Sequence, residues 1–133
     1  MELVLLIIVL ALFEYIVFSA KVGMARVKYQ VHAPAITGHP IFERLYRVQM
    51  NTLEQLIVFI PAIFAFTYMA EAQDWPGHEI AAFLGVIWII GRALYARAYV
   101  RDPAARGPGF LMTFGPTVLM LLLTLVLILL SVI

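Results

Sequence analysis

Four long apolar runs, separated by short polar breaks, account for nearly the whole chain. The first extends from about Leu3 to Ala20 or slightly beyond, and the last from Phe110 to Ile133. A helix that crosses a bilayer needs roughly 20 apolar residues to span about 30 Å of hydrocarbon. The pattern therefore predicts an all-α, integral membrane four-helix bundle. It forms a single domain over residues 1–133, with helices at about 3–24, 42–70, 79–100 and 109–132.

The polar breaks set the expected helix ends. The segment from Lys21 to Pro40 contains prolines, a histidine pair and several cations, a composition that favours a loop. Pro61 interrupts the second apolar run and predicts a kink, which neighbouring helices can accommodate. A cleavable signal peptide is not expected, because the chain begins with an acidic rather than a basic flank and Glu14 lies inside the first run.

Composition and charge placement agree with a membrane protein. Hydrophobic residues make up 64% of the chain and charged residues only 13%, far from the balance of soluble domains. All nine Lys and Arg residues lie in or beside the first and third connections, and the second has none. By the positive-inside rule, both basic connections are expected to be cytoplasmic, in a bacterial inner membrane or an endoplasmic reticulum. Cysteine is absent, so any thiol chemistry must use the sulfur of a substrate.

A polar stripe is predicted at the basic end of the second helix. Arg47, Asn51 and Glu54 are spaced i, i+4 and i+7, which places them on one helical face, with Gln49 off that stripe. Polar groups at membrane depth are costly, so each is a candidate for function or for holding helices together.

A second stripe is formed on the third helix by Arg92, Tyr95 and Tyr99, which are spaced i, i+3 and i+7. One interpretation is purely structural, with Glu54 paired to Arg92 or Arg47 inside the bundle and no ligand involved. The excess of cations over nearby acids favours instead an anionic ligand with several acceptor atoms.

The other titratable residues give weaker signals. Glu14 is a lone carboxylate in the first helix, and a packing role is expected more than a catalytic one. His32, His39 and His78 lie in predicted loops without the spacing of metal ligands, so no metal site is expected.

The segment Phe42 to Glu54, with the sequence FERLYRVQMNTLE, resembles the MAPEG family, the membrane-associated proteins in eicosanoid and glutathione metabolism. Thr37 to Pro40 and Arg92 to Tyr99 are similar to the leukotriene-C synthase and microsomal glutathione transferase branches of that family. With four spans in matching order, the resemblance covers essentially the full chain.

The resemblance implies a homotrimer of four-helix protomers, with glutathione as co-substrate between adjacent subunits near the cytoplasmic face. It implies two catalytic residues, Arg106, which would stabilise the thiolate, and Tyr99, which would lie close to the sulfur. The residues that it implies for glutathione binding are Arg26, Arg47, Gln49, Asn51, Glu54, Arg92 and Tyr95.

The implied chemistry is thiolate activation. A cation within reach of a thiol favours its charged form and lowers its pKa from about 8.5 toward neutrality. The thiolate could then add to a lipophilic electrophile or reduce a lipid hydroperoxide. Gln55 replaces a tyrosine of the leukotriene-C synthase branch, and Val27 replaces the second of its paired arginines, so leukotriene synthesis itself is not expected.

Two alternatives stay open. The chain could be a noncatalytic, lipid-binding membrane module with the same fold, a hypothesis that Gln55 and Val27 motivate. A small transporter or channel is suggested only by size and intramembrane charge, and no pair of broken helices relates the two halves as in many transporters. The expected partners are a lipophilic small molecule and membrane lipid, without nucleic acid.

Overall fold

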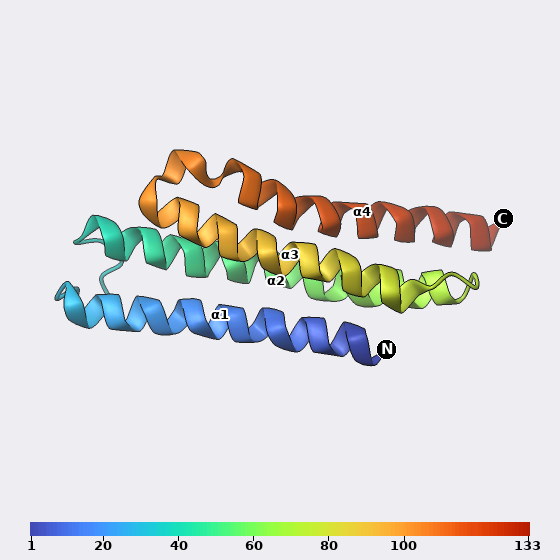
Figure 1. The fold of residues 1–133 in the computed structure, drawn as a ribbon, viewed down its shortest axis with the longest axis horizontal. Helices are drawn as coiled ribbons and strands as arrows, with labels where there is room; N and C mark the ends of the chain where they lie inside the picture. Colours follow the sequence, from blue (N-terminus) through green and yellow to red (C-terminus); the bar gives the residue numbers. More distant parts are fainter.

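The computed structural model describes all 133 residues and contains four long helices joined by short connections. Figure 1 shows them running alongside one another as an elongated bundle. Each of the four is long and apolar enough to cross a membrane. The all-α, four-helix fold predicted from the sequence is therefore confirmed. The helices are α1 (Glu2–Lys28), α2 (Pro40–Glu71), α3 (Gly77–Arg101) and α4 (Gly107–Val132), with a 3-10 turn, η1 (Pro103–Arg106), before α4.

The end of α1 differs from the sequence-based expectation. The sequence predicts that the first helix ends at about residue 24, and α1 instead continues to Lys28. Val22 and Ala25 are buried there and pack in one cluster with Phe42 of α2, so the helix continues for as long as it has an apolar face to cover. α2 in turn begins at Pro40, where the fixed φ of proline suits the first helical turn.

The charged end of the bundle is well defined. In Figure 1 both chain termini and the α2–α3 turn lie at one end, and the α1–α2 and α3–α4 connections lie at the other. Because every Lys and Arg lies in or near these last two connections, the cations gather toward one end. The side of the membrane that this end faces stays a prediction.

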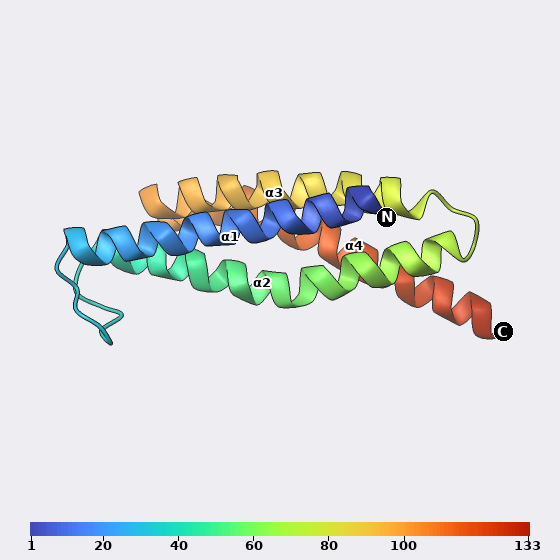
Figure 2. The same ribbon diagram turned by 90° about the horizontal axis from the view of Figure 1, so that it is seen from below.

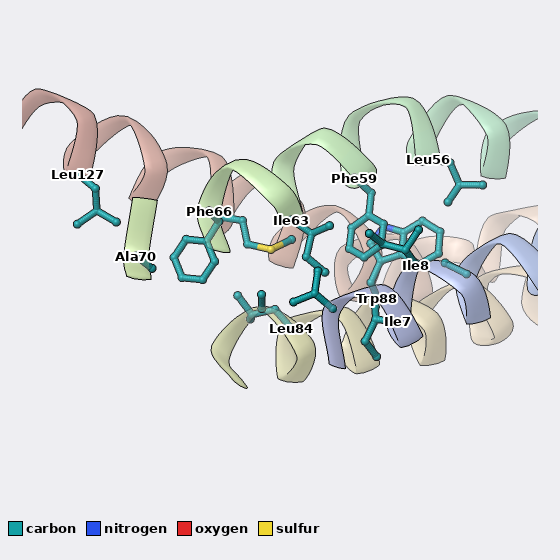
Figure 3. Close-up of a cluster of buried hydrophobic side chains, with 14 residues drawn as sticks. Ile7, Ile8, Leu56, Phe59, Ile63, Phe66, Ala70, Leu84, Trp88 and Leu127 are labelled. Carbon is teal, nitrogen blue, oxygen red and sulfur yellow. The ribbon is translucent and has the colours of Figure 1, made fainter. Parts of the chain in front are cut away.

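The core is apolar and is organised around stacked aromatic rings. Phe59 of α2 and Trp88 of α3 are fully buried, and their ring centroids lie 4.4 Å apart. Figure 3 shows them within a cluster of 14 buried side chains. Pro61 lies inside α2, which is bowed when viewed from below (Figure 2). Many large apolar side chains on the outer surface are exposed, as expected for a bundle whose solvent is lipid.

At Gly109, α4 packs closely against the backbone of α3. A Cβ atom placed on Gly109 would lie 2.4 Å from the backbone nitrogen of Tyr95. Small residues that allow such contact are characteristic of membrane helix interfaces. Gly109 therefore sets the position of α4 relative to the tyrosine stripe of α3.

Candidate functional site

A continuous chain of polar contacts connects the bundle interior to its surface. The Arg92 guanidinium is fully buried, and its Nη1 donates to Asn51 Oδ1 at 3.0 Å. The Asn51 amide donates in turn to Glu54 Oε2 at 3.1 Å. Arg47 Nη1 lies 3.1 Å from Glu54 Oε1, and this last ion pair is about half exposed. The structure thus brings the predicted α2 stripe together with Arg92, and Glu54 pairs with Arg47 while it reaches Arg92 only through Asn51.

Arg92 is incompletely satisfied. Its Nε and Nη2 are buried without a hydrogen-bond partner, and its guanidinium lies 4.1 Å from the ring centroid of Tyr95. Glu14 of α1 interacts with it electrostatically, yet one Glu14 carboxylate oxygen is also buried without a partner. Because buried polar atoms in proteins are nearly always paired, these atoms mark a place for water or for polar groups of a ligand.

The tyrosine stripe of α3 lies toward α4 and the η1 turn. The rings of Tyr95 and Tyr99 stack with centroids 5.5 Å apart, and Phe110 of α4 packs against the same cluster. Phe110 also lines a shallow hollow of about 430 Å³ together with Arg106. Arg106 is exposed, and its Nη1 donates to the Pro103 carbonyl at 2.8 Å, so its remaining N–H groups are free to meet a ligand.

Two predicted site residues lie elsewhere in the protomer. Gln49 donates to the hydroxyl of Tyr15 on α1 at 3.0 Å. Arg26 donates to the Ala35 carbonyl at 2.7 Å and lies over the Phe42 ring. With about 100° of rotation per residue, Gln49 is about 200° around α2 from Arg47. The predicted binding residues on α2 and α1 therefore fall into two groups on opposite sides of α2, which we call the two half-sites of the predicted site.

Sequence reasoning did not identify Tyr15 as the partner of Gln49 or Asn51 as the partner of Arg92. The sequence does contain a signal for the contact between Tyr15 and Gln49, because a tyrosine hydroxyl in an apolar helix needs a hydrogen-bond partner. The second contact depends on how α2 and α3 are rotated relative to each other, which the spacing within one helix does not specify.

Comparison with known proteins identifies the family. The model of the MAPEG family matches residues 4–126 of this chain. The chain belongs to the MAPEG family. The resemblance carried by the Phe42 to Glu54 segment is thereby confirmed, and the MAPEG chain is an integral, multi-pass membrane protein.

Curated relatives cover most of the chain. An uncharacterised protein of Synechocystis sp. is 45% identical over 105 residues, which are 79% of this chain and 72% of that protein. Human microsomal glutathione S-transferase 2 is 38% identical over 107 residues, 80% of this chain and 68% of the human protein. Bovine leukotriene C4 synthase is 34% identical over 89 residues, 67% of this chain and 55% of the synthase. These relatives support a membrane enzyme that uses glutathione.

Proposed function

We propose that this protein is a homotrimeric, glutathione-dependent membrane transferase that activates the glutathione thiol against a lipophilic electrophile, and that the same thiolate reduces lipophilic hydroperoxides. The observation that carries the proposal is the polar chain from buried Arg92 through Asn51 to Glu54 and Arg47. These residues provide hydrogen-bond donors in fixed positions and one carboxylate at the basic end of the bundle. The relatives of this protein include a glutathione S-transferase.

The chemistry of glutathione matches these groups. The tripeptide has two carboxylates, one ammonium, two amide links and a thiol. Glu54 is the acceptor for the ammonium, Arg47 and Arg26 are donors for the carboxylates, and Asn51 and Gln49 are suited to the amides. Because the Arg47–Glu54 pair is about half exposed, a ligand that offers both charges can replace it at little cost in stability.

Arg106 is the residue that we assign to the thiol. It lines the same hollow as Phe110, which packs in one cluster with Tyr95 and Tyr99, and its guanidinium forms no ion pair with a carboxylate of the chain. A fixed cation there would favour the thiolate, with the thiol proton released to water. In conjugation, the sulfur lone pair forms a bond to carbon as the electrophile expels its leaving group or takes up a proton. In peroxide reduction, two glutathione molecules and one hydroperoxide give the disulfide, an alcohol and water.

The two half-sites support a site built between copies of the chain. Arg26 and Gln49 face away from Arg47, Asn51 and Glu54, so one glutathione cannot contact both groups on a single protomer. A ring in which one face of α2 meets the opposite side of the next copy would join them, and a heterologous contact of this kind closes into a cyclic oligomer.

This assembly can be tested with mixed oligomers. We expect Arg26→Ala and Arg47→Ala each to abolish turnover alone. Mixed assemblies from co-expression should recover part of the activity, since some of their interfaces receive both intact arginines. Wild-type particles should have the mass of three 15.0 kDa chains. No recovery in the mixture, despite confirmed mixed assembly, would place each site within one protomer.

The thiolate is tested by an ultraviolet difference spectrum of purified protein titrated with glutathione near neutral pH. We expect a saturable thiolate absorbance that is lost in Arg106→Ala and kept in Lys28→Ala, a matched exposed cation at the same end of the bundle. An unchanged signal in Arg106→Ala would overturn the assignment of that residue. No signal in the wild type, with no acceleration of conjugation over buffer, would favour the noncatalytic module.

A further inference from the structure

A second recess at the basic end lies apart from the polar chain. It is a groove of about 450 Å³ between α1, α2 and α3. Figure 2 shows these three helices together, with α1 between α2 and α3 in this view. Its interior is apolar, and its lining includes the buried side chains of Phe18, Val48 and Ala96. The apolar side chains of this interior offer no hydrogen bonds to the amide links of a polar tripeptide such as glutathione.

Three cations border this apolar interior. Lys21 of α1 and Arg97 and Arg101 of α3 line the groove and are exposed. None of the three side chains makes a hydrogen bond or an ion pair within the chain, and the one aromatic contact among them is Lys21 over the Phe18 ring. The nearby carboxylate of Asp102 accepts from the Ala104 backbone N–H in the next turn. The groove therefore combines an apolar interior with three positive charges that form no direct ion pair within the chain.

We propose that this groove binds an anionic phospholipid of the surrounding membrane. An amphipathic anion is the ligand class that matches it, because the acyl chain would follow Phe18 and Ala93 while the phosphate meets the three cations. Basic pockets between membrane helices are suited to anionic headgroups. A zwitterionic lipid carries its own cation and would gain less from the same three charges.

The lipid groove opens on a different side of α2 from Arg47. On α2 its residues Leu45 and Val48 lie about 160° and 100° around the helix from Arg47. On α3, however, Ala96 of the groove packs in one cluster with Tyr95. A bound lipid would therefore contact α3, the helix that carries the tyrosine stripe.

The experiment compares lipid retention by the full-length protein in native mass spectrometry. The probes are phosphatidylglycerol and phosphatidylcholine with identical acyl chains, added to the delipidated protein in detergent. We expect the wild type to retain phosphatidylglycerol preferentially. Neutralising Lys21, Arg97 and Arg101 to Gln should weaken its binding about 5-fold for each cation and about 100-fold together. Lys28→Gln, which removes one exposed cation outside the groove, should weaken it less than Arg97→Gln.

A second pair of variants separates a formed groove from surface charge alone. Ala93→Trp fills the groove and keeps all three cations, whereas Leu94→Trp places the same bulk at the next, exposed position outside it. We expect Ala93→Trp to lose retention of phosphatidylglycerol and Leu94→Trp to keep it, with both variants having the wild-type oligomeric mass. Equal retention by the two Trp variants, equal retention of the two lipids by the wild type, or equal loss in Lys28→Gln and Arg97→Gln would each overturn the proposal.

Discussion

Substituting Gly109 by alanine should disrupt the contact between α3 and α4 where it supports the tyrosine stripe. The added Cβ would lie 2.4 Å from the Tyr95 nitrogen and 2.6 Å from its Cα. Ordinary van der Waals contact begins at 3.4 Å, so the helices must separate by about 1 Å. Backbone atoms cannot rotate out of the way as a flexible side chain can. Overpacking of this kind lowers the free energy of unfolding by about 1–3 kcal/mol. Because the neighbour is rigid backbone, we expect Gly109→Ala to lie near the upper end, about 3 kcal/mol, which is roughly a 150-fold change in the unfolding constant.

The assay is equilibrium unfolding in mixed micelles with rising SDS, followed by tryptophan fluorescence in a Trp75→Phe background, which leaves Trp88, fully buried in the core, as the reporter. The matched control is Gly115→Ala on the same helix, where a Cβ would meet nothing within 4 Å. That control should be stabilised by about 0.5–1 kcal/mol, because alanine is the better helix former. If Gly109→Ala were as stable as Gly115→Ala, the close packing of α4 on Tyr95 would be refuted.

Two further predictions concern the polar chain. Asn51→Leu removes the side-chain acceptor of buried Arg92 and should cost about 1.5–3 kcal/mol in the same unfolding assay, while Asn51→Asp keeps an acceptor and should recover most of that loss. An unaltered stability in Asn51→Leu would mean that Arg92 finds another partner. Glu54→Gln should change stability by less than about 1 kcal/mol, because its ion pair is half exposed, yet weaken glutathione binding in the difference spectrum at least tenfold. Undiminished affinity in that variant would exclude Glu54 as the ammonium acceptor.

The helices were predictable because membrane solvation imposes a strong, local pattern. A run of about 20 apolar residues is sufficient evidence of a span, whatever its neighbours are. The end of α1 was not predictable in the same way. The composition of Lys21 to Lys28 favours water, and only the burial of Val22 and Ala25 beside Phe42 keeps it helical. That burial depends on α2, the next helix, and not on the segment itself.

The candidate site shows the same contrast between features that are local in the sequence and contacts between helices. Spacing within one helix was enough to place Arg47, Asn51 and Glu54 on one face, since helical periodicity is a local property. Contacts between helices could not be predicted from this spacing. The bond from Arg92 to Asn51 and the bond from Gln49 to Tyr15 both depend on how neighbouring helices are rotated relative to each other, which spacing within one helix does not specify.

The polar chain also shows how structural and ligand-binding roles can be separated within one group of residues. Arg92 is fully buried, so moving it would leave a charge without compensation in a medium that solvates charge poorly. Its contact with Asn51 is therefore the part that holds α2 to α3. Arg47 is about half exposed and bound only to Glu54 of its own helix, so it can leave that pair without disturbing α3. A ligand group that replaces Arg47 beside Glu54 would thus meet a carboxylate that is already oriented by Asn51, which Arg92 holds in turn. The structural and the ligand-binding interpretations of these residues are therefore compatible, because the contacts that hold α2 to α3 also orient the Glu54 carboxylate for a ligand.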